Sequence, residues 1–150
     1  MLEIKRFDSP NEDFERLDAL LNDSYVERFG DIALKYFEIN SLKNMDDFFI
    51  AYDGDIAAAI ICLKKFDEET GEVKRLFVSP EYRRTGLAMK MIKCCEERAK
   101  EIGYNSMMLE TGAKMPEAIE LYEKNGYNRI DNFKEYIGDD ETYCMKKNLL

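Results

Sequence analysis

The sequence predicts a mixed α/β fold whose sheet is antiparallel at first and holds a parallel pair later. An apolar hairpin pattern occupies residues 48–63. A strand–helix–strand–helix–strand order then follows from Glu72 to Lys147, and a helical crossover joins strands that run parallel. At 150 residues, the chain is expected to form one domain (residues 1–150) with a substantial core.

The N-terminal third predicts a strand, a helix and an irregular helical segment. Leu2 and Ile4 favour a short strand over residues 1–7. Ser9-Pro10 is expected to start a helix whose apolar residues recur at three- and four-residue steps. These residues are Phe14, Leu17, Leu20 and Leu21. Residues 23–44 predict a second, irregular helix.

The hairpin is predicted from two apolar runs, residues 48–52 and 56–63, around the turn sequence Asp53-Gly54. A polar loop over residues 64–71 leads to a strand over residues 72–78, rich in β-branched and aromatic side chains. Ser79-Pro80 ends this strand, because proline cannot donate a hydrogen bond to a sheet.

A long amphipathic helix is predicted over residues 87–102, with Gly103 as a left-handed cap. Its apolar face consists of Leu87, Ala88, Met91, Ile92, Cys95, Ala99 and Ile102. The remaining elements are expected to be strands over residues 106–111, 127–130 and 142–147 and a short helix over residues 116–125.

The junction before the long helix predicts an anion site. The first amides of a helix lack internal partners, and Gly86 would let a phosphate approach the backbone closely. Arg83 and Arg84 add positive charge. Lys74, Arg75, Lys90 and Lys93 are expected to cluster around the same turn. The pattern is neither a Walker A loop nor a dinucleotide fingerprint, and a capped surface helix would explain residues 83–88 equally well.

Two motifs in register carry a resemblance to a family. Arg83-x-x-Gly86-x-Ala88, preceded by Val78-x-Pro80, is similar to the acetyl-CoA pyrophosphate motif of the GNAT superfamily of N-acetyltransferases. Ala118-x-x-Leu121-Tyr122-Glu123-x-x-Gly126-Tyr127 resembles the second motif of that superfamily. The resemblance covers roughly residues 48–132. It implies the GNAT fold, a twisted, mostly antiparallel sheet with a splayed parallel pair, flanked by helices.

The resemblance implies an enzyme that transfers an acetyl group from acetyl-CoA, as co-substrate, to the primary amine of a small molecule by direct attack. Tyr122 is then the phenol that protonates the departing sulfur, although a tyrosine on this helix face could also serve only as core. The residues expected to bind acetyl-CoA are Leu76, Phe77, Val78, Arg83, Arg84, Thr85, Gly86, Leu87, Ala88, Ala118 and Tyr122.

Two carboxylates, Glu72 and Glu110, compete for the role of the base that removes a proton from the amine. Position alone does not choose between them. Lys74 and Arg75 lie close to Glu72 in sequence and should lower its basicity, whereas apolar neighbours should raise the pKa of Glu110. We therefore expect Glu110 to be the base, directly or through water. Glu72 is expected mainly to orient the ammonium group of the acceptor.

The acceptor pocket is expected to be lined by Tyr25, Tyr36 and Phe37, with Glu72 as its charged group, although the aromatic residues could equally be core. Two other functions stay open. The chain could be a protein or peptide N-terminal acetyltransferase, if its acceptor groove is open. It could also be a GNAT-like module that binds acyl-CoA without turnover, although the presence of Glu72, Glu110 and Tyr122 favours the enzyme.

Composition narrows the partners. The net charge of −9 argues against nucleic acid, and no apolar run is long enough to predict a membrane span. The chain has four cysteines and no histidine, so free thiols in a cytoplasmic protein are expected rather than a metal site. A homodimer is compatible with these features.

Overall fold

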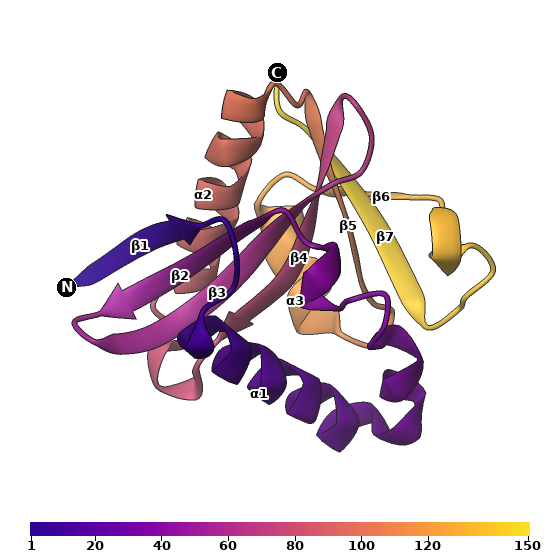
Figure 1. Cartoon of the computed structure of the whole chain (residues 1–150). Helices are drawn as coiled ribbons and strands as arrows, with labels where there is room; N and C mark the ends of the chain where they lie inside the picture. Colours follow the sequence, from indigo (N-terminus) through magenta and orange to yellow (C-terminus); the bar gives the residue numbers. More distant parts are fainter.

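The computed structural model describes residues 1–150 and shows a seven-stranded sheet with helices on both faces (Figure 1). The strands are β1 (Leu2–Phe7), β2 (Asp47–Asp53), β3 (Ile56–Lys65), β4 (Thr70–Val78), β5 (Ser106–Gly112), β6 (Asn128–Ile130) and β7 (Thr142–Asn148). Their order is β1-β2-β3-β4-β5-β7-β6, and only the β4–β5 pair is parallel. The predicted fold class is confirmed.

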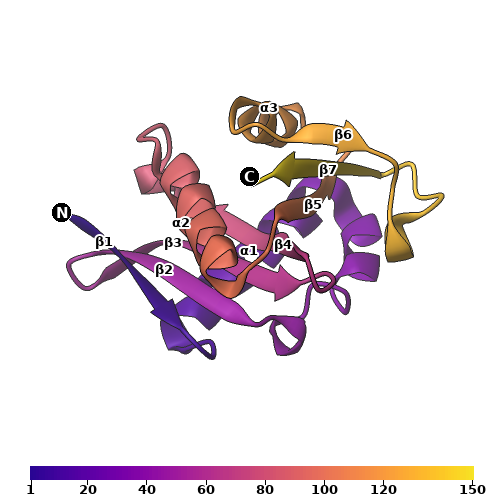
Figure 2. The same ribbon diagram turned by 90° about the horizontal axis from the view of Figure 1, so that it is seen from above.

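The two long helices cover opposite faces of the early sheet (Figure 2). Helix α1 (Glu12–Phe29) buries Phe14, Leu17 and Leu21 against one face, and α2 (Leu87–Ile102) buries its apolar side against the other. Strand β3 is therefore covered on both sides, which explains its nearly continuous apolar sequence. Gly103 adopts the expected left-handed conformation and caps α2.

The N-terminal helix differs from its prediction at both ends. It begins at Glu12 rather than at Ser9-Pro10, because the side chain of Asn11 caps it by accepting a hydrogen bond from the Phe14 amide (2.9 Å). It also continues to Phe29, into the residues 23–44 that were predicted to form a second, irregular helix. The Ser24 hydroxyl donates to the Leu21 carbonyl (2.7 Å), so this residue is accommodated inside the helix.

The irregular segment that follows contains two 3₁₀ helices, η1 (Gly30–Tyr36) and η2 (Leu42–Asn44), rather than one second α-helix. Gly30, with φ of +68°, ends α1 and turns the chain. Segment η1 thereby lies beside the end of α1 and next to β5 and β7 (Figure 1).

Strands β4 and β5 separate soon after they meet. Their pairing covers only Thr70–Glu72 against Ser106–Met108. Strand β4 also carries a bulge opposite β3, where the register shifts between Ile60 and Cys62, and Arg75 within it has φ of +58°. The bulge bends β4 away from β5, so residues 73–78 have no pairing partner on the β5 side.

Beyond the separation, β5 pairs with β7 over its whole length, and β7 in turn pairs with β6. Helix α3 (Pro116–Lys124) places Tyr122 in the core cluster that α2 also joins. A smaller cluster of Met108, Phe133, Tyr136 and Cys144 fills the opposite face. The two faces of β5 and β7 thus carry two different core clusters.

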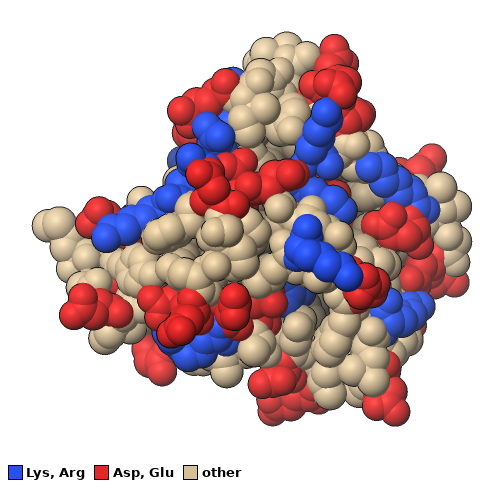
Figure 3. All heavy atoms as spheres, viewed as in Figure 1, with Lys and Arg blue, Asp and Glu red and all other residues tan.

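The surface mixes both signs of charge. Acidic and basic side chains are interspersed over the face in Figure 3, despite the net charge of −9. None of the helices combines the length and apolar character needed to cross a membrane.

Candidate acetyltransferase site

The turn between β4 and α2 has the geometry of an anion site. Gly86 is the N-cap of α2 with φ of +81°, and no side chain caps the first amides of the helix. A Cβ atom added to Gly86 would have no atom from elsewhere in the protein within 4 Å, so the space beside this residue is open. The residues of the chain thus fit a phosphate group here.

Side chains around this turn hold it in place. Arg83 donates from Nε to the Val78 carbonyl (2.9 Å), and its guanidinium lies over the Phe77 ring. The Thr85 hydroxyl donates to the Tyr82 carbonyl (2.6 Å). Arg84 is exposed and has φ of +63°. Leu87 is buried and Ala88 half-buried, so these two residues offer the site mainly their backbone.

The prediction that six basic residues cluster at this turn is wrong for two of them. Lys74 and Arg75 lie away from it, with side chains that are only 4% and 3% exposed. Both point toward the face that α1 and Tyr136 cover, where they have buried partners. The bulge at Arg75 explains the difference, because it breaks the two-residue alternation that sequence reasoning assumes.

The predicted cofactor strand lies beside the gap. Leu76 lines a cavity between the two halves of the sheet, whereas Phe77 is buried in the core cluster under α1 and Val78 packs in the cluster under α2. Since residues 76–78 are unpaired toward β5, their backbone groups, rather than the side chain of Phe77, are available to a ligand.

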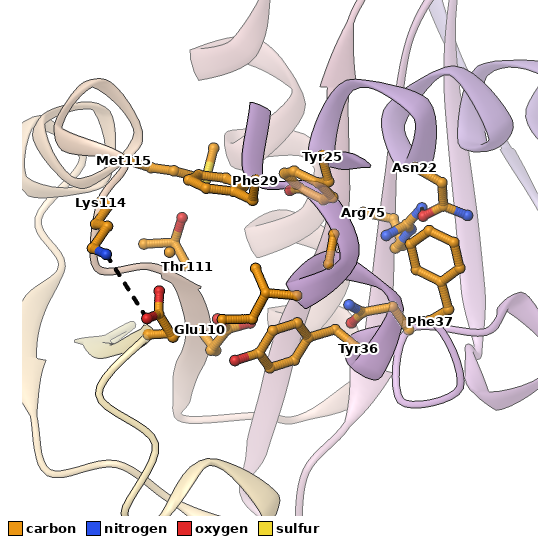
Figure 4. A pocket seen from close by; sticks show the side chains of 15 residues that line it. Asn22, Tyr25, Phe29, Tyr36, Phe37, Arg75, Glu110, Thr111, Lys114 and Met115 are labelled. Atoms are coloured by element: carbon orange, nitrogen blue, oxygen red, sulfur yellow. Dashed lines mark hydrogen bonds and ion pairs between the residues drawn. The ribbon is translucent and has the colours of Figure 1, made fainter. Parts of the chain in front are cut away.

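Two adjoining cavities occupy the space between α1, η1 and the separated strands, and Figure 4 shows the larger one. The larger one encloses about 660 Å³, counted with its open mouth, and the smaller one about 410 Å³. They share Tyr25, Asn40, Arg75, Glu110 and Thr111.

Glu110 lies on the wall of both cavities. Burial raises the pKa of its carboxyl to about 7, against the opposing effect of the nearby Lys74 charge. The negative charges of Glu72 and Asp139 raise it further. A carboxyl group with this pKa is suited to accept a proton near neutral pH.

Tyr122 projects from α3 into the smaller cavity. Its ring packs edge-on against Tyr127, with ring centres 5.8 Å apart, and its hydroxyl makes no hydrogen bond within the protein. Since no fully buried polar atom lacks a partner, this hydroxyl must reach the cavity. Burial and the charge of Glu110 keep the pKa of Tyr122 above that of a free tyrosine, so the phenol holds its proton. Ala118, one helical turn earlier, is half-buried against the same cluster.

Glu72 is placed differently from Glu110. Its side chain is only 5% exposed, pairs with Lys74 (3.5 Å) and lines neither cavity. Lys74 in turn donates to Asn40 (2.9 Å) and to the Tyr136 hydroxyl (3.1 Å). Glu72 is thus a counter-ion within a buried polar cluster behind Glu110, and its position lends no support to direct contact with an acceptor.

The three predicted aromatic residues all line the larger cavity (Figure 4). Tyr25 comes from α1, Tyr36 from η1 and Phe37 from the residue after it. Sequence reasoning missed Phe29, Met115 and above all Arg75, which line the same space. Nothing local in the sequence marks Arg75, because its position depends on the β4 bulge and on partners in α1.

Comparisons with known proteins identify the family. Residues 14–127 match the model of the acetyltransferase (GNAT) family, and the chain belongs to that family. It is 33% identical over 84 residues to the uncharacterized N-acetyltransferase YjgM of Escherichia coli K12, covering 55% of this chain and 50% of that protein. It is 34% identical over 79 residues to an IAA acetyltransferase of Azospirillum brasilense, covering 53% and 52%. The chain thus spans about half the length of these relatives.

Solved structures share the whole fold. A proposed acyl-CoA N-acyltransferase from Klebsiella pneumoniae is 25% identical, with a TM-score of 0.82 over 100% of this chain and 99% of that one. A GNAT family acetyltransferase from Elizabethkingia anophelis, solved with acetyl-CoA bound, has a TM-score of 0.73 at 17% identity over 98% and 97% of the two chains.

Proposed function

We propose that this protein transfers an acetyl group from acetyl-CoA to the primary amine of a small-molecule acceptor by direct attack. Family membership supports the reaction class. The observation that carries the proposal is the meeting of Glu110 and Tyr122 on one cavity, at the point where β4 and β5 separate. One side chain there can accept a proton and the other can give one.

The residues of the site have separate roles in the proposed acetyl transfer. Acetyl-CoA supplies the acetyl group as an activated thioester. Glu110 accepts a proton from the amine, directly or through a water molecule, as nitrogen bonds to the acetyl carbon. Tyr122 donates its proton to the sulfur as the carbon–sulfur bond breaks, so the products are an amide and a thiol. The open amides at Gly86 and the exposed Arg84 would hold the phosphates.

The mouth of the larger cavity supports a small acceptor over a polypeptide. Arg28 at the end of α1 pairs with Glu117 and donates to the Lys114 carbonyl (3.0 Å), which ties α1 to the start of α3. On the other side, Tyr36 donates to Asp139 (2.5 Å) and Lys35 pairs with the same carboxylate (3.3 Å). These contacts hold α1 and η1 close to the segments across the cavity, which favours an acceptor smaller than a polypeptide.

The reaction is tested by following thiol release from acetyl-CoA with a panel of primary amines, with mass spectrometry of the products. We expect amide formation with at least one small amine. Binding of acetyl-CoA without turnover on any amine or on peptide N-termini would instead favour a binding module.

The cofactor turn gives a sharper prediction. Replacing Gly86 with valine should weaken acetyl-CoA binding in calorimetry by more than about tenfold, because a branched side chain would fill the space in front of the helix amides. It should also cost roughly 1–3 kcal/mol of stability, because valine is strained at positive φ.

Gly103→Val is the matched control. Gly103 caps the other end of α2, also at positive φ and with no atom near an added Cβ. It should lose similar stability and keep its affinity for acetyl-CoA. Equal affinity of the two variants would place the phosphates elsewhere.

A further inference from the structure

Arg75 and Glu110 are the only charged residues that line both cavities. A ligand that spans the shared space therefore meets the guanidinium of Arg75, which is paired with Asp18 (2.7 Å), and the carboxyl group of Glu110. Tyr25 lies near both, since the charges of Arg75 and Glu110 both act on its hydroxyl, in opposite directions. The site thus presents two unlike polar ends to a single molecule.

The guanidinium of Arg75 has N–H groups that form no hydrogen bond within the protein. Its Nε donates to Asp18 (2.7 Å), and its Nη2 donates to the Asn22 side chain (2.5 Å) and the Asp18 carbonyl (3.3 Å). Its Nη1 has no partner. Because no fully buried nitrogen lacks a hydrogen bond, Nη1 must reach the cavity space. Nη1 is therefore the part of this guanidinium left for a ligand, on a side chain that is only 3% exposed.

The position of Arg75 is enforced by the fold. Its backbone has φ of +58°, which is unfavourable for a residue with a long side chain, and the β4 bulge maintains it. Asp18 and Asn22, one helical turn apart on α1, fix the guanidinium by accepting hydrogen bonds from it. A group held this firmly is preorganised to bind an anionic group without further ordering.

One part of the wall of the larger cavity is apolar and aromatic, and Lys114 and Glu141 add a charged part. Tyr25, Phe29, Tyr36 and Phe37 line the larger cavity together with Ile32 and Met115. Such a wall favours a hydrophobic or aromatic body over a sugar or a polyamine.

We infer that the acceptor is an amine that also carries a carboxylate and a hydrophobic body, the chemistry of an apolar or aromatic amino acid. Its carboxylate binds the free N–H groups of Arg75, its side chain packs on the aromatic wall, and its amine faces Glu110. This inference rests on the proposed acetyl transfer and narrows its substrate class.

The test compares L-phenylalanine with 2-phenylethylamine, which share the amine and the ring and differ by the carboxylate. We expect the wild-type protein to prefer phenylalanine in kcat/KM. In Arg75→Met the ratio of the two kcat/KM values should fall by about 10- to 100-fold, the range expected for loss of a hydrogen bond to a charged group. Arg75→Lys should give an intermediate ratio, because it keeps the charge and loses the planar fork.

The wild-type measurement decides the matter even if Arg75→Met folds poorly. A preference for 2-phenylethylamine, or no reaction and no binding of either compound by a protein that binds acetyl-CoA, would overturn the inference. Equal losses for both compounds in Arg75→Met would make Arg75 a structural residue. Failure to bind acetyl-CoA, or to release thiol with any amine, would instead count against the proposed function itself.

Discussion

Tyr122→Phe should lower kcat by roughly 10²–10⁴-fold and leave the fold unchanged. The substitution keeps the ring against Tyr127 and removes only a hydroxyl that has no partner in the protein. The free energy of unfolding should therefore barely move, and the loss should appear in kcat, because proton donation to sulfur belongs to the transition state. Steady-state kinetics and chemical denaturation measure the two quantities.

Tyr127→Phe is the matched control for that variant. The Tyr127 hydroxyl donates to the buried carboxylate of Glu96 (2.8 Å), so its removal should cost about 1–3 kcal/mol of stability and leave kcat unaltered. If Tyr122→Phe retains the wild-type kcat, the phenol is only core, and another group or water protonates the thiol.

Glu110→Gln should remove the acidic limb of the pH profile. In the wild-type protein kcat/KM should fall below about pH 7, since Glu110 must lose its proton before it can act as a base. The glutamine variant should be slower by roughly 10²–10⁴-fold near neutral pH. It should regain rate only as the pH rises toward ~10, where the amine loses its proton to solvent. An unchanged acidic limb would remove Glu110 from the role of base.

The same variant should change stability in a defined direction. The pKa of Glu110 is raised from 4.5 to about 7 in the folded protein, so folding favours the protonated form. This stabilisation is present below pH 4.5 and lost as the pH rises through 7. Glu110→Gln should therefore match the wild type at pH 4 and be more stable at pH 8, by up to about 3 kcal/mol.

Glu72→Gln separates the two carboxylates. Because the charge of Glu72 raises the pKa of Glu110, its removal should move the acidic limb to lower pH, and the limb itself should persist. If the acceptor KM instead rises strongly and the acidic limb of the pH profile does not move, Glu72 contacts the ammonium group of the acceptor, as sequence reasoning predicted.

The elements that sequence reasoning predicted well are those with local causes. The 3.6-residue period of α2, its Gly103 cap and the Asp53-Gly54 turn are each contained in a short stretch of chain. The turn at Gly86 is equally local, because one glycine and one helix start define it, and its role in binding acetyl-CoA stays a prediction.

The acceptor side of the site could not be predicted in the same way, because distant contacts build it. Tyr36 is oriented by Asp139, which lies 103 residues later. Arg75 reaches the cavity only because a bulge turns its backbone and α1 supplies its partners. The insertion of β7 between β5 and β6 likewise has no local signal, although it places Tyr136 and Asp139 behind Glu110.

The separation of β4 from β5 leaves two strand edges facing each other inside the molecule. Residues 73–78 of β4 pair only with β3, and residues 109–112 of β5 pair only with β7, so peptide groups on both inner edges have no sheet partner. Unpaired edges of this kind are templates for association with another chain. The ligand-free protein should therefore be the form that self-associates on heating.

The arm of acetyl-CoA carries amide groups, and these would form hydrogen bonds with the inner strand edges as a short strand would. Acetyl-CoA at a hundred times its Kd should add about 2.7 kcal/mol to the free energy of unfolding and delay aggregation. ADP at a hundred times its own Kd should add the same free energy of unfolding, but it lacks such an arm and leaves the inner edges open, so it should delay aggregation less. Light scattering during thermal unfolding with each compound would show whether acetyl-CoA protects the inner strand edges from association with another chain.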